Sequence, residues 1–327
     1  MTEPGLSRKP GALFWIVLVL LTVGAGLLSV VTGPMNDPPE WVLLKLRLPR
    51  LALALLSGAS LSVAGCVLQS ILRNDLATPY TLGISAGAGL AAGSIIVAGA
   101  AVPVLGMVAA GTGGALLAVF AVFFLASISR GGDTGATLLL AGVTINLIGA
   151  SILLLLEYFS DADRILEIVR WMMGDLAVVG WSKPLFLLPA TLVGILLVLC
   201  RTGVLNQVAQ GDEMAASRGV SVRRERNLLL AASALLAGAT VGVAGPVGFV
   251  GLIVPHVMRK LCGADYRTLV PASAVGGMLL VVSADILSRM VISPAEIPIG
   301  ITMALLGGPF FLALLIRGAD RKVGPGL

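Results

Sequence analysis

Long apolar runs separated by short polar stretches fill almost the whole chain. A membrane-spanning helix needs about 20 consecutive apolar residues. By that measure the pattern predicts an all-α polytopic membrane protein with about ten spans, of which the eighth is short for a full crossing. The expected spans are residues 13–32, 50–71, 83–101, 104–128, 136–157, 184–200, 228–246, 249–260, 268–288 and 298–316.

A segment of the second expected span reappears in the seventh. Leu55–Gly65 reads LLSGASLSVAG and Leu235–Gly245 reads LLAGATVGVAG. Since the copies lie five spans apart, they cross the membrane in opposite directions, which is typical of inverted repeats in transporters. Chance similarity between helices rich in Gly and Ala is the alternative. Gly and Pro interrupt the chain near both copies, at 74–79 and 245–249, and such breaks at membrane depth need protein or a water-filled cavity beside them.

Three segments between the spans stand out, two of them expected on the outer side of the membrane and one on the inner side. Residues 34–46 contain three prolines and read as a loop. Residues 158–182 mix charged and apolar side chains in the pattern of an amphipathic helix on the membrane surface. The longest inner loop, about residues 201–227, is basic and contains a short polar helix. Asp212 is expected to cap the start of that helix, and Gly219 suits the left-handed residue at its end.

Composition and charge agree with a single transmembrane domain over residues 1–327. The chain is 57% hydrophobic and only 12% charged. Ten spans place both termini on one side, and the Lys and Arg residues concentrate on that side, which predicts cytoplasmic termini in the cytoplasmic (inner) membrane. This bias accounts for the net charge of +5 without a nucleic-acid partner.

The sequence lacks the residues that several kinds of chemistry require. No lysine follows a glycine, so the chain has no Gly-Lys-[Ser/Thr] phosphate-binding loop. No set of convergent catalytic groups is visible, and the single histidine, His256, has no second ligand at metal-binding spacing. We therefore expect no enzyme activity, no cofactor and no metal site.

Charge inside the spans is also scarce. Of the acidic residues, only Glu157 and Asp285 lie within expected spans, both near outer ends, whereas ion-coupled carriers usually bury ionisable residues on the ion's path. A secondary carrier that works alone and a membrane-embedded enzyme remain as rival interpretations, and neither is favoured by a feature of the sequence.

Arginines gather at the expected outer ends of two spans. Arg47 and Arg50 open the second span, and Arg289 closes the ninth. An arginine at a helix end can simply extend to the lipid headgroups. As a set, the three guanidinium groups can instead bind carboxylates on a docking protein.

From about Leu43 to Arg317 the chain resembles the FecCD-type permease subunits of ABC importers for iron–siderophore complexes, haem and cobalamin. The segments that carry the resemblance are LRLPR at 46–50, GCVLQ at 65–69, NDLATP at 74–79, LGISAGAG at 82–89, LAGV at 140–143, WMMG at 171–174, GFVGLIVPH at 248–256, ADILSR at 284–289 and EIPIG at 296–300.

The resemblance implies the type II importer permease fold and a defined set of partners. These are a second permease subunit, identical or paralogous, two cytoplasmic ABC ATPases that hydrolyse the ATP, and a periplasmic or lipid-anchored substrate-binding protein. It implies an iron chelate, a ferric siderophore, as substrate, with haem or cobalamin as the alternative.

The resemblance also assigns roles to individual residues. Arg47, Arg50 and Arg289 match the residues that dock the binding protein. Gly132, Asp133 and Thr134 match the cytoplasmic gate, although this segment departs from the hydroxyl-rich form of cobalamin permeases. The ATPase-coupling residues are matched by Gly211, Asp212, Glu213, Ala215, Arg218 and Gly219.

Overall fold

The computed structural model describes residues 10–33, 38–100, 102–128, 134–293 and 295–320, and within these residues all regular secondary structure is helical. The predicted all-α fold is therefore confirmed. The long helices occupy the ten predicted spans: α1 (Ala12–Val31), α3 (Leu48–Ile71), α4 (Ile84–Val97), α5 (Val104–Ile128), α6 (Thr134–Tyr158), α8 (Ser182–Cys200), α11 (Val222–Ala244), α12 (Val250–Cys262), α13 (Tyr266–Met290) and α14 (Ile299–Asp320).

Shorter elements join these helices. They are α2 (Glu40–Val42), a π-helical turn (Leu43–Arg47), a 3₁₀ turn (Pro79–Leu82), α7 (Ala162–Met172), α9 (Thr202–Val208) and α10 (Asp212–Ser217). The amphipathic helix predicted within 158–182 is α7, which confirms the helix; its place on the outer membrane surface stays a prediction. Among the described helices, seven are long and apolar enough to cross a membrane, whereas α4 and the apolar part of α14 are shorter.

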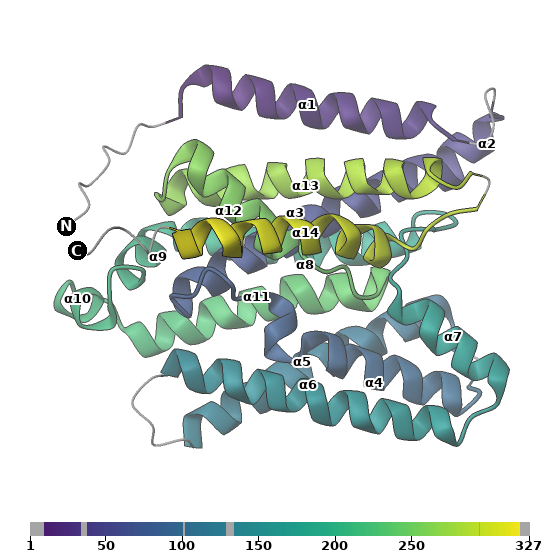
Figure 1. Cartoon of the computed structure of the whole chain (residues 1–327), viewed down its shortest axis with the longest axis horizontal. Helices are drawn as coiled ribbons and strands as arrows, with labels where there is room; N and C mark the ends of the chain where they lie inside the picture. Colours follow the sequence, from purple (N-terminus) through teal and green to yellow (C-terminus); the bar gives the residue numbers. More distant parts are fainter. Residues whose placement is uncertain (1–9, 34–37, 101, 129–133, 294, 321–327) are drawn as a thin grey trace.

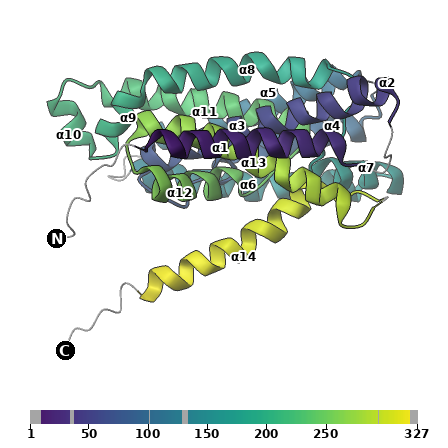
Figure 2. The same ribbon diagram turned by 90° about the horizontal axis from the view of Figure 1, so that it is seen from above.

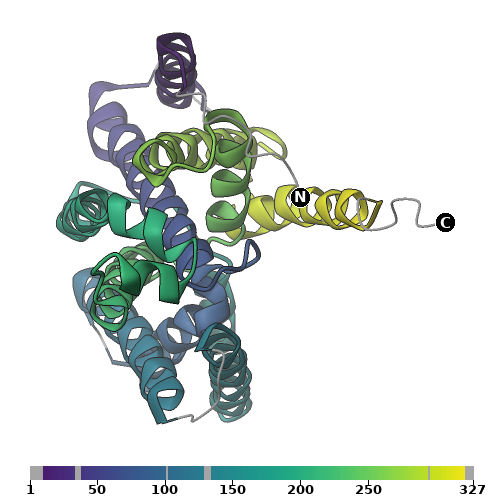
Figure 3. The ribbon, with the colours of Figure 1, turned by 90° about the vertical axis from the view of Figure 1, so that its left-hand side faces the viewer.

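The long helices run side by side, with α10 at one end of the bundle and α2 and α7 at the other (Figure 1). Helix α1 begins, and α14 ends, at the end that carries α10. This agrees with an even number of crossings. Seen from above and from the side, α14 diverges from the other helices (Figures 2 and 3).

Helix α3 lies in the middle of the bundle, where it packs against α8, α11, α12 and α13. Two of its glycines allow backbone to meet backbone. A Cβ atom on Gly58 would lie 2.2 Å from the carbonyl oxygen of Gly277, and one on Gly65 would lie 2.0 Å from that of Gly251. Small residues permit such close approach between helices in a membrane.

The two predicted helix breaks contact each other. Helix α11 ends at Ala244, and α12 begins at Val250 after Phe249, which has a φ of +66°. The backbone N–H of Val247 in this break donates to the hydroxyl of Tyr80, 2.5 Å away, in the 3₁₀ turn that follows the other break. Protein groups thus satisfy part of the irregular backbone, as membrane depth requires.

The prediction of a loop at 34–46 was wrong for the second half of this segment. Helix begins at Glu40, directly after Pro39, and continues into α3 through the π-helical turn. Carbonyl groups in this turn are bonded from outside the helix, because Trp181 Nε1 donates to Leu44 O at 3.2 Å and Gly180 N donates to Lys45 O at 2.7 Å.

We predict that Gly58→Ala destabilises the protein by about 1–3 kcal/mol, because the added methyl group must force apart two backbones in contact. Gly113→Ala is the matched control: it is also a helical glycine, and a Cβ there would meet no atom within 4 Å. Thermal unfolding of both variants in detergent measures the difference. Equal unfolding temperatures for the two variants would contradict the close α3–α13 contact.

Candidate functional site

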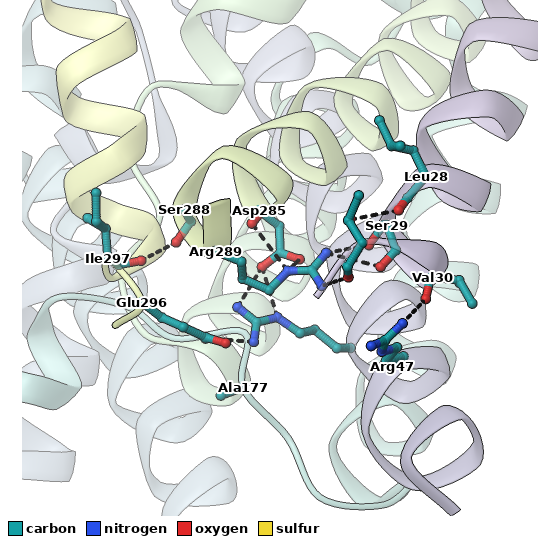
Figure 4. Close-up of polar contacts among 12 residues, drawn as sticks. Leu28, Ser29, Val30, Arg47, Ala177, Asp285, Ser288, Arg289, Glu296 and Ile297 are labelled. Atoms are coloured by element: carbon teal, nitrogen blue, oxygen red, sulfur yellow. Dashed lines mark hydrogen bonds and ion pairs between the residues drawn. The ribbon is translucent and has the colours of Figure 1, made fainter. Parts of the chain in front are cut away.

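The three outer arginines lie together at one end of the bundle, around a single buried carboxylate. Asp285 on α13 is 1% exposed. Arg50, in the first turn of α3, donates from Nε to Asp285 Oδ1 at 2.9 Å, and Arg289 Nε lies 3.1 Å from Asp285 Oδ2. Figure 4 shows Asp285 and Arg289 within this group of contacts. Two guanidinium groups therefore share one counter-ion.

Two of these arginines also hold the end of α1. Arg47 donates from Nη1 to the carbonyl oxygens of Val30 and Val31 at 2.6 and 3.0 Å. Arg289 donates to Ser29 Oγ at 2.8 Å and to the carbonyl oxygen of Thr32 at 3.1 Å. The last carbonyls of a helix lack partners within the helix and carry partial negative charge, so cationic donors are favourable there.

Glu296 is the more exposed acidic member of the cluster. Its Oε2 accepts from Arg50 Nη1 at 2.7 Å, and its side chain is 42% exposed, against 13% for Arg50. Glu296 lies in the connection between α13 and α14, where the Ser288 hydroxyl also bonds to the Ile297 carbonyl. A cavity of ≈290 Å³ beside Arg50 and Glu296 is also lined by Arg170 and Asp175.

Sequence reasoning identified the arginines and missed their internal partners. The structure gives each of the three an intramolecular contact, so headgroup contact is not needed to explain their position. In the sequence, Asp285 lies four residues before Arg289, and this spacing puts two side chains on the same face of a helix. That spacing, together with the rarity of acidic residues in the spans, was the available signal.

The predicted inner site is the short helix α10, which forms where the sequence predicted it. Its capping differs from the prediction. The residue before the helix is Gly211, with a φ of +132°, and Asp212 is the first helical residue and makes no cap. Asp212 instead pairs through Oδ2 with Arg226 at 2.7 Å and through Oδ1 with Arg73. Because Arg226 and Arg73 bind this carboxylate, it does not accept a hydrogen bond from the free N–H groups at the start of the helix.

The other end of α10 agrees with the prediction. Gly219 has a φ of +83°, in the left-handed region that suits glycine. Arg218 donates to Gln210 Oε1 at 3.1 Å. Ala215 is fully buried, whereas Met214 is 51% exposed and Glu213 is exposed. One face of the helix thus packs on the protein and the other faces outward.

The predicted gate falls mostly outside the described residues. Gly132 and Asp133 lie in the segment between α5 and α6 that is not described, and Thr134 is the first residue of α6. The gate assignment therefore stays a prediction.

Comparison with known proteins agrees with this helical bundle. A solved structure of a metal-chelate type ABC transporter in an inward-facing conformation superposes with a TM-score of 0.86, at 30% identity, over 94% of this chain and 100% of that chain. The bundle is thus that of an ABC importer permease.

The model of the FecCD transport family matches residues 11–317, and the chain belongs to that family. The hemin transport system permease HmuU of Yersinia pestis is 39% identical over 94% of this chain and 96% of its own length. The vitamin B12 import system permease BtuC of Vibrio cholerae is 39% identical over 84% of this chain and 83% of its own length. The relatives are transport permeases, and the chain is a multi-pass membrane protein of this kind.

We predict that Asp285→Asn destabilises the protein by about 3–5 kcal/mol, because it leaves two largely buried guanidinium groups side by side without their shared counter-ion. Glu296→Gln is the matched control, since it removes a carboxylate from the same cluster at an exposed position, where an ion pair contributes at most about 1 kcal/mol. Thermal unfolding in detergent measures both. A smaller loss for Asp285→Asn than for Glu296→Gln would contradict the central role of Asp285.

Proposed function

We propose that this chain imports a ferric chelate across the cytoplasmic membrane, driven by two partner ATPases and supplied by a substrate-binding protein. The observation that carries the proposal is the placement of two charged sites at opposite ends of one bundle. The outer site holds Arg50 and the inner site holds Arg73, and both residues belong to α3 or follow it directly. Both proposed partners can therefore act on the same helix.

Helix α10 is the proposed contact for the ATPase. Exposed apolar Met214 and exposed Glu213 stand on a helix that the rest of the loop holds in place. An exposed methionine on a small polar helix suits insertion into a cleft of a soluble partner. In this proposal the partner hydrolyses the ATP, and the movement of the partner is transmitted to α10.

The outer arginine cluster is the proposed contact for the binding protein. Because Arg50 is bound to Glu296, a carboxylate of the docking protein reaches Arg50 by replacing Glu296. Charged rims of this kind steer docking and make it sensitive to salt.

A second permease subunit completes the proposed path. Helix α14 diverges from the bundle (Figure 2), and Leu305, Leu312 and Ile316 on it are 59–66% exposed. A helix that leaves its own bundle with a large apolar surface is suited to packing against another permease, identical or paralogous. The substrate path then runs between the two subunits, with both termini of each in the cytoplasm.

The first functional prediction concerns energy source and substrate. Proteoliposomes that contain the chain with its ATPase and binding protein are expected to import ferrichrome only with ATP and magnesium. Haemin and cyanocobalamin are tested in parallel, because a hemin and a vitamin B12 relative are each 39% identical to this chain over the matched residues. Uptake of labelled substrate is the measurement.

The control contains the permease alone under a sodium or proton gradient. Robust gradient-driven uptake there would replace the proposal with an ion-coupled carrier. ATP-driven uptake of haemin or cyanocobalamin in preference to ferrichrome would keep the importer and change its substrate.

The second functional prediction concerns docking. Glu296→Gln is expected to tighten binding of the substrate-binding protein by about two- to fivefold, since it removes an exposed competitor for Arg50 worth at most about 1 kcal/mol. Surface-based binding measurements at several salt concentrations test this. Asp175→Asn, which removes a carboxylate from the lining of the same cavity without a contact to Arg50, is the control. Weaker or unchanged docking by Glu296→Gln would argue against Arg50 as a docking residue.

A further inference from the structure

We propose that Asp212 is a positioning residue that transmits movement of α10 to both α3 and α11. The inference rests on the proposed function, because it assumes that α10 is the helix moved by the ATPase. It adds to that function a specific link between the moved helix and the transmembrane bundle.

The contacts of Asp212 reach both repeat helices. Oδ2 lies 2.7 Å from Arg226 Nη2, in the second turn of α11. Oδ1 accepts from Arg73, two residues after the last residue of α3. Helices α3 and α11 contain the two similar sequence segments and pack against each other. One carboxylate on α10 thus contacts an arginine at the end of each of the two helices that contain the similar segments.

The backbone at Arg73 is the second observation. Its φ of +47° lies in the left-handed region, where a non-glycine residue is uncommon and strained. Glycine would adopt this conformation at no steric cost. Strain of this kind persists where the surroundings over-determine it, and it clusters at functional sites. An arginine in this turn places its guanidinium group on Asp212, which a glycine would not do.

The exposed position of the Asp212–Arg73 ion pair indicates that this pair links α10 to α3 rather than stabilising the fold. Asp212 and Arg73 are 41% and 44% exposed at their side chains. Ion pairs at such positions contribute little to stability. The Arg226 side chain is 14% exposed, so its pair with Asp212 contributes more than the Arg73 pair. Removal of the carboxylate is therefore expected to cost stability through the Arg226 pair only, while the connection from α10 to α3 is lost.

A second route from α10 into the bundle exists through α9. Helix α9 packs against α10, α3 and α13, and Ser70 Oγ donates to Leu205 O on α9 at 3.4 Å. This route is made of packing contacts and does not involve Asp212. The two routes are therefore distinguished by changing the carboxylate alone.

The experiment measures substrate imported per ATP hydrolysed by the full complex in proteoliposomes. The probe is ferrichrome, haemin or cyanocobalamin, whichever the wild-type complex imports. Asp212→Asn is expected to lower this ratio by at least about fivefold, the lower end of typical coupling between sites. Asp212→Glu is expected to restore most of it.

The matched control is Asp75→Asn. Asp75 is also an exposed carboxylate paired with an arginine, Arg259 at 2.7 Å, but this pair does not include α10. The control is expected to keep the wild-type ratio. A fall as large as that of Asp212→Asn would overturn the inference, because it would show a general need for charge in this region.

A double-mutant cycle tests whether the arginines act through Asp212. Arg73→Gln and Arg226→Gln are each expected to lower the ratio, and neither is expected to lower it further in the Asp212→Asn protein. Additive losses would overturn the inference. So would a wild-type ratio in Asp212→Asn, or loss of the ATPase from that purified complex, which would make Asp212 an ATPase-binding residue. Failure of the wild-type complex to import any probe is a different result, since it contradicts the proposed function itself.

Discussion

The close approach of α3 to α12 and α13 is the constraint on which the rest of the bundle depends. Lipid is as apolar as the side chains of a spanning helix, so helix association in a membrane relies on packing rather than on exclusion from water. At Gly58 and Gly65 the backbones themselves are in contact, which no other residue type allows. The position of α3 then determines where α8 and α11 pack.

The central position of α3 also explains why the charged sites lie where they do. A helix of 24 residues spans about 36 Å, the thickness of a membrane core and part of its headgroup layers. Arg50 near one end of α3 and Arg73 just beyond the other end therefore lie near the two aqueous boundaries. Both arginines bind acidic residues from other helices, so each end of α3 is attached to neighbours by charge while its middle is attached by packing.

The sequence predicted the elements well because each follows from local composition. Span lengths, the amphipathic α7 and the glycine that ends α10 are all visible within a few residues. Contacts between distant residues were not visible in this way. The bond between Tyr80 and Val247 joins residues 167 positions apart, and Asp285 meets Arg50 from 235 positions away. The misplaced cap at Asp212 has the same cause, because Arg73 and Arg226 compete for a carboxylate whose local role looked obvious.

The attachment of α1 bears on the order in which the chain is assembled. This helix is mostly exposed, with only 22% of its apolar window buried, and it packs mainly against α13. Its last carbonyls are bound by Arg47 and by Arg289, which is synthesised more than 250 residues after α1. During synthesis α1 therefore lies in the membrane without α13, its main neighbour, until the intervening helices have been inserted. Helix α1 is therefore secured only after α13 has been made, and its attachment is completed at the arginine cluster.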